Sequence, residues 1–369
     1  MAEMYTRSIL TGVREVRFEQ VPIPEPGPTQ ALIRVHACAL CTWEQRVYAG
    51  VERDYYPLLG GHEVAGVLVK AGERVLTQAR PGDRVVAAML PRCGQCVSCR
   101  RGLDNLCDNA QTNGPGHAPA GPGGLSEYVL VEDYQLYPVY NDGVPFEELC
   151  LAEPLACVLR SVKKAAVQPA DNVVVIGAGI MGLLHLTLAQ RRGARVIVSE
   201  PNSVRAEVAR ALGATAIIDP TREDFVRRAQ ELTGQGPDVI FCTAGIPEVI
   251  EQAVRAVGKG GRVMMYASVH PRGSRITVDP NLFHCREITL TGTMSQSRED
   301  FLQAVSLLSN RIVDVRPLVS AVYPLSQLQD ALEAAISPDT YRVVVSMQVK
   351  NPGRYDHETK PGKPQGACL

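Results

Sequence analysis

Short apolar runs broken by glycine and proline fill the first 150 residues. Runs of this kind between turn clusters, such as those at 22–28 and 81–83, are typical of strands in a small β-barrel with loops. The predicted strands are Ala31–Ala37, Val64–Val69, Arg84–Ala88 and Glu127–Val131.

The pattern changes near residue 155, where continuous Val/Ile runs alternate with segments of helical spacing. Strands that are apolar throughout are buried on both faces, so this region predicts an α/β fold with a doubly wound parallel sheet. Strands are expected at Asn172–Ile176, Arg195–Ser199, Ala216–Ile218, Asp238–Thr243 and Gly261–Ala267. Helices are expected at Ile180–Arg192, Ser203–Leu212, Glu223–Leu232 and Pro247–Val257.

The pattern changes again after about residue 290. Two predicted helices, Glu299–Leu308 and Leu325–Ala335, precede a predicted strand at Tyr341–Met347. Ile288–Met294 is expected to be an exposed edge strand of the parallel sheet. The last residues are rich in proline, glycine and lysine, which is typical of a flexible tail.

Composition narrows the class of protein. A length of 369 residues suggests about two domains, and a net charge of −1 argues against a nucleic-acid binder. No apolar run approaches the roughly 20 residues that span a bilayer, and the N-terminus lacks the apolar core of a signal peptide. Apart from four clustered cysteines at 93–107, most cysteines are scattered through apolar segments, as free buried thiols are. We therefore expect a reduced, cytoplasmic protein without membrane association.

Four cysteines lie close together in a segment of loop composition, at Cys93, Cys96, Cys99 and Cys107. Four thiolates can close a tetrahedral shell around zinc, and a closed shell has no position for a substrate. The spacing therefore predicts a structural zinc site in a lobe at about 91–110. A disulfide knot and unrelated buried thiols are the alternatives.

A glycine-rich turn follows the predicted strand Asn172–Ile176 and opens a helix, in the pattern Gly177-x-Gly179-x-x-Gly182. The first glycine permits the tight turn, the second lets the backbone approach a pyrophosphate, and the third allows close packing of helix on strand. Ile180 and Met181 open the helix, whose free N–H groups attract phosphate.

A carboxylate ends the next strand, about 20 residues after the turn. Glu200 can hydrogen-bond the ribose hydroxyls of NAD, and its charge repels a 2′-phosphate, so NAD is expected rather than NADP. Arg205 is the complication, since it could contact the ribose or accept a 2′-phosphate.

Four further residues are of ligand type but are widely separated. Cys41 follows an apolar strand, His62 and Glu63 precede another, and Glu153 lies in a Glu-Pro pair near the domain change. Thiolate, imidazole and carboxylate are the ligands of open, catalytic zinc sites. Their spacing alone does not group them.

These motifs together resemble the zinc-dependent medium-chain dehydrogenase/reductase superfamily. Gly61-His62-Glu63-x-x-Gly66 with Gly72 and Val75 fits its zinc signature, and the four-cysteine lobe and the glycine turn fit its other two motifs. The resemblance implies a GroES-like β-barrel catalytic domain (1–155), a Rossmann NAD-binding domain (156–293), a return to the catalytic domain (294–350) and a tail (351–369).

The resemblance also implies roles for the scattered residues. Cys41 and His62 align with ligands of the catalytic zinc, Glu63 with an adjacent, exchangeable ligand, and Glu153 with the third ligand of a branch that contains polyol (sorbitol-type) and threonine dehydrogenases. Two zinc ions per chain, and a homodimer or homotetramer joined through the Rossmann domains, follow from the same resemblance.

One segment departs from the family pattern. The family reads Cys-x-Thr/Ser-Asp-x-His around the first zinc ligand, and its hydroxyl and imidazole relay the alcohol proton. This chain has Trp43 and Arg46 at those places. An indole N–H only donates and a guanidinium keeps its charge, so neither replaces the relay. Thr42 could take the place of the missing hydroxyl, or Glu63, Glu153 or Glu44 could accept the proton through water.

The sequence thus predicts an NAD-dependent zinc enzyme that interconverts a secondary alcohol and a ketone, with a polyol, sugar or cyclitol as the expected substrate. Three alternatives stay open. They are an L-threonine 3-dehydrogenase, a ketone reductase of secondary metabolism, and a non-catalytic zinc-binding protein that retains the fold.

Overall fold

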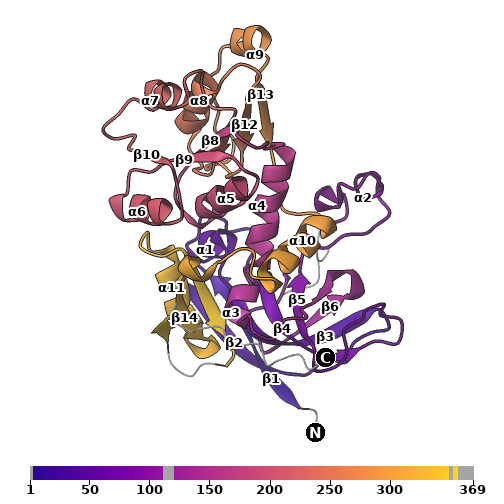
Figure 1. Ribbon diagram of the computed structural model, residues 1–369. Helices are drawn as coiled ribbons and strands as arrows, with labels where there is room; N and C mark the ends of the chain where they lie inside the picture. The colour runs from indigo at the N-terminus through magenta and orange to yellow at the C-terminus, as the bar shows by residue number, and fades with distance from the viewer. Residues whose placement is uncertain (1–2, 111–119, 349–351, 356–369) are drawn as a thin grey trace, which may run out of the picture. The chain divides into compact units, whose positions relative to one another are not determined.

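The computed structural model describes residues 3–110, 120–348 and 352–355 (Figure 1). It divides into two compact units, Met1–Glu153 with Ser297–Leu369, and Pro154–Gln296. These divisions lie close to the predicted boundaries after residues 155 and 293. The predicted tail, 351–369, lies outside the described residues except at 352–355, where β16 (Gly353–Arg354) pairs with β14 (Val319–Pro324) rather than hanging free.

The first unit contains a hairpin and an eight-stranded mixed sheet. In the hairpin, β1 (Met4–Gly12) and β2 (Glu15–Pro22) run antiparallel. The sheet has the order β16-β14-β15-β3-β4-β5-β7, and β6 pairs with β3. Its remaining strands are β3 (Gln30–Ala39), β4 (Glu63–Ala71), β5 (Arg84–Ala88), β6 (Tyr128–Glu132), β7 (Leu136–Pro138) and β15 (Arg342–Ser346).

Strand β15 comes from the end of the chain and pairs antiparallel with β3 near its beginning, with Val344 opposite Ala39. Several apolar residues of each strand, such as Ile33 and Val35 of β3 and Val343 and Val345 of β15, are buried in one core cluster together with residues of α11 (Leu328–Ile336). The other helical segments are short, apart from α10. They are α1 (Thr42–Tyr48), α2 (Val97–Arg100), α3 (Phe146–Leu149), α10 (Arg298–Ser309) and the 3-10 turns Asp104–Leu106, Asp133–Gln135, Arg316–Leu318 and Leu325–Gln327.

The helix predicted at Leu325–Ala335 is shorter than expected, because Leu325–Gln327 forms a 3-10 turn and the α-helix begins at Leu328. A 3-10 turn at a helix N-terminus is common, and periodicity does not distinguish it from the helix. The helix α4 (Ala152–Lys164) crosses the division between the units and was not predicted.

The second unit is the predicted doubly wound parallel sheet, which confirms the fold class. The strand order is β10-β9-β8-β11-β12-β13, with all pairs parallel. The strands are β8 (Asn172–Ile176), β9 (Arg195–Ser199), β10 (Ala216–Ile218), β11 (Val239–Cys242), β12 (Arg262–Met265) and β13 (Thr289–Gly292). The helices are α5 (Ile180–Arg191), α6 (Ser203–Ala211), α7 (Phe225–Thr233), α8 (Pro247–Ala256) and α9 (Pro280–Arg286).

The continuous apolar strands are buried on both faces, as their composition predicts. Alternate residues such as Val174 and Ile240 join one core cluster with α7 and α8. On β11, Phe241 instead contacts the ring of His185 from α5. The order reverses between β8 and β11, and ligands of such sheets bind at the carboxyl ends of the strands on either side of the reversal. An edge strand was predicted at Ile288–Met294. The strand β13 is indeed the last of the sheet, and among the described strands it pairs only with β12.

Among the described residues, no helix is both long and apolar enough to cross a membrane.

Candidate metal and cofactor sites

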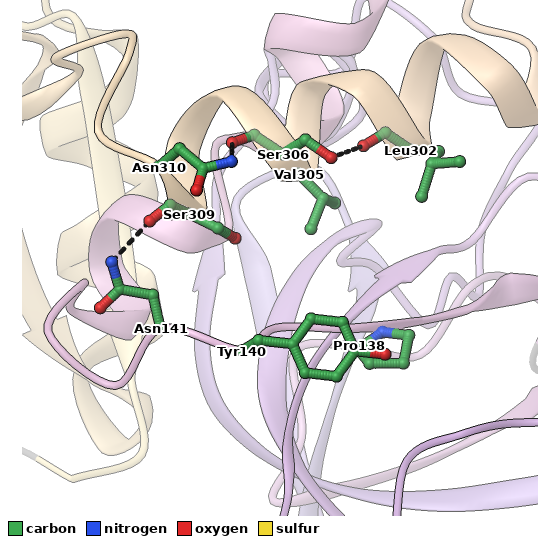
Figure 2. A pocket seen from close by; sticks show the side chains of 8 residues that line it. All are labelled: Pro138, Tyr140, Asn141, Leu302, Val305, Ser306, Ser309 and Asn310. Atoms are coloured by element: carbon green, nitrogen blue, oxygen red, sulfur yellow. Dashed lines mark hydrogen bonds between the residues drawn. The ribbon is translucent and has the colours of Figure 1, made fainter. Parts of the chain in front are cut away.

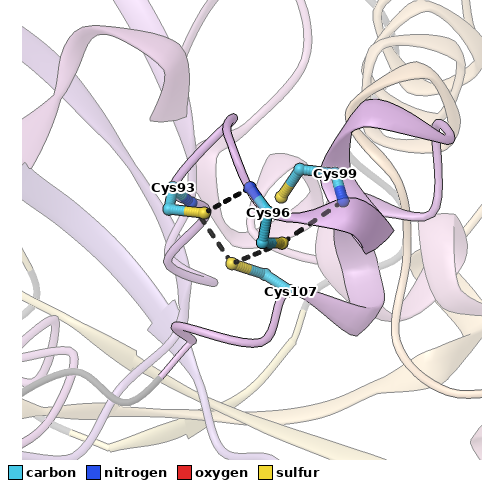
Figure 3. A group of neighbouring side chains, drawn as sticks. All are labelled: Cys93, Cys96, Cys99 and Cys107. Carbon is cyan, nitrogen blue, oxygen red and sulfur yellow. Dashed lines mark hydrogen bonds between the residues drawn. The ribbon is translucent and has the colours of Figure 1, made fainter.

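The four predicted zinc ligands of the lobe converge (Figure 3). Cys93 lies in the loop before α2, Cys96 caps that helix, Cys99 lies in it, and Cys107 follows the next 3-10 turn. Their four sulfur atoms all lie within 4.8 Å of one another. All four are free thiols, so the disulfide alternative is wrong.

Backbone N–H groups prepare this cluster for a cation. The N–H groups of Gln95 and Cys96 donate to the sulfur of Cys93 at 3.4 and 3.3 Å, and that of Cys99 donates to the sulfur of Cys96 at 3.4 Å. The N–H of Gln95, the side-chain amide of Asn109 and the N–H of Cys96 lower the pKa of Cys93 to about 6, whereas burial raises the pKa of Cys99 to about 12. Four soft donors in a closed group fit zinc held for structure rather than for catalysis.

An ionic cluster ties the lobe to the rest of its unit. The carboxylate of Asp104 lies 3.3 Å from Nε of Arg92 and 3.0 Å from Nε of Arg298 at the start of α10. The side chains of Arg92 and Asp104 are only 1% and 6% exposed. Buried charges of this kind must be paired, so the cluster holds the lobe in one orientation.

The second group of predicted ligands also converges. Cys41 is the N-cap of α1, and His62 and Glu63 lie at the start of β4. Ala39 of β3 pairs with Glu63 of β4, and this register brings Cys41 beside His62. One ligand atom from each of the three residues lies within 4.8 Å of the others, and thiolate, imidazole and carboxylate fit catalytic zinc.

Glu44 holds the imidazole of His62 in place. Its fully buried carboxylate accepts hydrogen bonds from Nδ1 of His62 at 2.7 Å and from the N–H of Gly61 at 3.0 Å. Burial acts to raise the pKa of Glu44, but the charge of His62 and these hydrogen bonds lower it. Because Glu44 is shielded from solvent, its position argues against a role as proton acceptor and for a role in orienting His62.

Glu63 forms a buried ion pair that the sequence reasoning missed. Nη2 of Arg342 on β15 lies 2.8 Å from Oε1 of Glu63, and both side chains are at most 2% exposed. Nη1 of the same arginine donates to the carbonyl of Leu40 at 3.0 Å. Burial raises the pKa of Glu63 to about 7 against the opposing charge of Arg342. The available signal was an arginine that leads an otherwise apolar strand, because a buried charge needs a partner.

Glu153 lies outside the group of three ligand atoms. It is 9% exposed, and its charge acts on both Glu63 and Arg342, so it lies in the surroundings of the site. The structure therefore brings Cys41, His62 and Glu63 together and leaves Glu153 beside them.

Trp43 lies directly beside the zinc-type ligands. Its ring centroid is 5.8 Å from that of His62 and 5.3 Å from that of Tyr55. Arg46 pairs with Glu52 at 2.8 Å. Thr42 is exposed and precedes Trp43 by one position on α1, so the two side chains diverge by about 100° around the helix. Thr42 therefore does not occupy the place of Trp43.

The glycine turn has the geometry that its spacing predicts. Gly177 has φ +101°, and a Cβ on Gly182 would collide with the carbonyl of Gly177. A Cβ on Gly179 would meet nothing closer than Nη1 of Arg205 at 3.8 Å. The open space over Gly179 therefore fits the approach of a phosphate to the N-terminus of α5, where Ile180 begins the helix and Met181 follows.

Glu200 lies against this turn, at the end of β9. Its Oε2 accepts from the N–H of Ala178 at 2.7 Å, and its Oε1 accepts from the N–H of Asn202 at 2.9 Å. Each carboxylate oxygen has two acceptor positions, so both oxygens can still accept from ribose hydroxyls.

A separate cavity of about 210 Å³ lies in the first unit between residues 138–141 and 302–310 (Figure 2). Asn141, Ser306 and Asn310 already donate to the backbone carbonyls of Ser309, Leu302 and Ser306. The cavity contains none of the predicted site residues and no titratable group except Tyr140, which is 77% exposed. It is not the candidate active site.

Comparison with known proteins identifies the family. The alcohol dehydrogenase GroES-like domain matches residues 27–141, and the zinc-binding dehydrogenase domain matches residues 181–310. An L-threonine 3-dehydrogenase from Caldanaerobacter subterraneus is 32% identical over 88% of this chain and 93% of its own. The chain belongs to the zinc-dependent medium-chain dehydrogenase/reductase superfamily.

Two further relatives agree with this assignment. A sorbitol dehydrogenase from Bacillus subtilis is 28% identical over 89% of this chain and 93% of its own. The crystal structure of a zinc-binding dehydrogenase from Sinorhizobium meliloti, bound to NADP, is 29% identical and superposes with a TM-score of 0.85 over 93% of this chain and 99% of its own. The predicted family, fold class and dehydrogenase activity are thereby confirmed, with zinc and a nicotinamide cofactor.

Proposed function

We propose that this enzyme oxidises a secondary alcohol to a ketone with NAD, and that its substrate is a polyol, sugar or cyclitol. The observation that carries the proposal is the convergence of Cys41, His62 and Glu63 to within 4.8 Å, in a chain that also has the glycine turn. Relatives named for sorbitol and D-arabinitol support the polyhydroxylated substrate.

The protein's own residues hold and orient the reacting groups. Zinc held by Cys41 and His62 would act as a Lewis acid on the alcohol oxygen, and NAD would accept the hydride. Glu44 accepts a hydrogen bond from Nδ1 of His62, so Nε2 is the nitrogen that would hold zinc. Glu63 and Glu153 are the proposed further ligands, and the ion pair with Arg342 restrains Glu63.

The alcohol proton needs a route that differs from the family's relay. Trp43 cannot accept it, and Arg46 is engaged by Glu52. Glu153, which is 9% exposed, is the proposed acceptor through water, because Glu44 and Glu63 have no exposure to solvent and are engaged by His62 and Arg342.

Glu200 supports NAD as the preferred cofactor, since its carboxylate would repel a 2′-phosphate beside the turn. Two observations favour NADP instead: Arg205 lies beside the glycine turn, and one relative of known structure is bound to NADP. We expect Glu200→Gly to relax the preference in kcat/KM between NAD and NADP. An unchanged preference would contradict the role of Glu200.

The cheapest test follows NADH absorbance with sorbitol, myo-inositol, L-threonine and 2,3-butanediol. L-Threonine belongs in the panel because several relatives at 30–32% identity are L-threonine 3-dehydrogenases. Cys41→Ser and His62→Ala should abolish turnover and leave NAD binding intact. Cys285→Ser, which changes an exposed thiol, is the matched control and should be as active as the unmodified enzyme. Activity that survives removal of the metal would refute the zinc mechanism.

Two zinc ions per chain are proposed, one in the four-cysteine lobe and one at Cys41 and His62. Metal analysis should give two per chain, and one in Cys41→Ser. A homodimer or homotetramer formed through the exposed edge strand β13 is also proposed. Thr289→Lys, at an exposed position of that strand, should lower the mass measured by light scattering.

A further inference from the structure

Two aromatic side chains form a corner beside the zinc-type ligands. The rings of Trp43 and Tyr55 meet edge-on at 88° with centroids 5.3 Å apart, and Trp43 also meets the ring of His62 at 60°. We refer to Trp43 and Tyr55 as the aromatic corner. Trp43 stands at the position where the family pattern has a small hydroxyl residue.

The corner is anchored on one side and accessible on the other. Trp43 packs against the core cluster of the first unit and is half-buried, so its orientation is fixed. Tyr55 is 40% exposed and comes from the loop after α1. Backbone hydrogen bonds from Val51 to Arg46 and from Leu58 to Leu10 hold the ends of this loop at 2.9 Å each.

The chemistry of the corner differs from that of a polyol site. An indole offers one N–H donor and no acceptor, so hydroxyls that lie over its face lose hydrogen bonds to water without replacement. The face of an aromatic ring is electron-rich and attracts C–H groups, which a saturated six-membered ring presents on its own face. An open chain also loses more conformational freedom when it is ordered against a surface than a rigid ring does.

We propose that the aromatic corner makes the enzyme selective for secondary alcohols whose carbinol carbon belongs to a saturated six-membered ring. This inference rests on the proposed function and narrows its substrate from polyols, sugars and cyclitols to the cyclic members. Trp43 acts as a specificity-determining residue that stacks on the ring while the alcohol lies at His62.

Matched pairs of alcohols test the proposal in the full-length zinc enzyme with NAD. The pairs are 1,2-cyclohexanediol against 2,3-butanediol and myo-inositol against sorbitol, with 1-phenylethanol against 2-butanol for an aromatic ring. In each of the first two pairs the ring compound should have the higher kcat/KM. Aromatic contacts of this kind are worth about 2- to 12-fold in affinity, and Trp43→Leu should reduce the ring preference by that factor, mainly through KM.

Conservative variants separate stacking from folding. Trp43→Phe retains an aromatic face and should keep most of the ring preference. If Trp43→Leu does not fold, Tyr55→Leu removes the other wall from a 40% exposed position and should halve the preference or more. A ring preference that is absent in the unmodified enzyme, or unchanged in the leucine variants, overturns the proposal. So does a preference confined to 1-phenylethanol.

Fluorescence distinguishes a failure of this proposal from a failure of the proposed function. Trp43 is the single tryptophan of the chain, so its emission reports on the corner alone. We expect 1,2-cyclohexanediol, and not 2,3-butanediol, to change that emission saturably. Ring-specific binding without turnover of any alcohol would refute the proposed oxidation and support the corner. Turnover without ring-specific binding would do the reverse, and the absence of both refutes both.

Discussion

Replacing Glu44 by alanine is expected to weaken zinc binding at Cys41 and His62 and to destabilise the first unit. The carboxylate accepts from Nδ1 of His62 at 2.7 Å and from the N–H of Gly61 at 3.0 Å, with no exposure to solvent. Alanine therefore frees the imidazole to rotate and leaves a buried N–H without an acceptor.

The two contacts set the size of the effect. A hydrogen bond to a charged group contributes about 1.5–3 kcal/mol, and a buried N–H left unsatisfied costs about 1–3 kcal/mol. We expect the free energy of unfolding to fall by about 3 kcal/mol. Loss of a hydrogen-bond partner of a metal-binding histidine typically weakens metal affinity by about 10- to 100-fold, and we expect Glu44→Ala to fall in that range.

Zinc affinity is measured by competition with a chromophoric chelator, and stability by urea unfolding of the zinc-loaded protein. Glu44→Gln keeps an acceptor oxygen without the charge and should show an intermediate loss. Glu25→Ala removes the same atoms from a side chain that is 78% exposed, and it should change neither quantity measurably. If Glu44→Ala binds zinc within twofold of the unmodified enzyme, the assignment of Glu44 to orienting His62 is refuted.

Three further changes test other parts of the structure. Asp104→Asn removes the carboxylate that pairs with buried Arg92, and it should lower the free energy of unfolding by about 3 kcal/mol in urea titrations and loosen zinc in the lobe. Burial lowers the pKa of His185 to about 4, so the unfolded chain binds a proton below pH 6.5 while the native chain does not. The contribution of His185 to stability should be constant above pH 6.5 and fall by up to roughly 3 kcal/mol towards pH 4, so the difference in unfolding free energy between the unmodified enzyme and His185→Gln should change by that amount over this range. Gly182→Ala would force α5 away from the carbonyl of Gly177, and it should weaken NAD binding about tenfold in calorimetric titrations.

Each of these predictions has an opposing outcome. Full zinc occupancy of the lobe together with unchanged unfolding in Asp104→Asn would show that the ionic cluster contributes little. A pH profile of stability that is the same with and without His185 would assign the acid loss to other groups. Unaltered NAD binding in Gly182→Ala would mean that the turn can relax.

The parallel sheet was predictable because each of its strands is buried on both faces. The strands at Asn172–Ile176 and Arg195–Ser199 agree with their predicted bounds, since a run of β-branched residues between polar ends leaves little freedom. In the first unit the pattern was weaker. The helix α1 was missed because Cys41 to Tyr48 carries a mixture of polar and aromatic residues without clear helical spacing.

The two metal sites differ in how far the sequence predicts them, because the ligands of one are local and those of the other are distant in sequence. The four-cysteine lobe is local, so spacing alone was sufficient to group its ligands. Cys41 and His62 are joined only by the pairing of β3 with β4, which spacing does not encode. The roles of Glu44 and Arg342 depend on contacts with His62 and Glu63 across the fold, and only the structure supplies those contacts.

The ion pair between Glu63 and Arg342 has a consequence for biosynthesis. Strand β15 leaves the ribosome about 280 residues after Glu63, which corresponds to roughly 15–60 s of translation. Until β15 is synthesised, Ala37–Ala39 of β3 lack their partner strand on that side and Glu63 lacks the counter-charge of Arg342. The whole second unit, Pro154–Gln296, is synthesised within the same interval. The surroundings of Glu63 are thus completed only after all six strands of the dinucleotide-binding sheet have been synthesised.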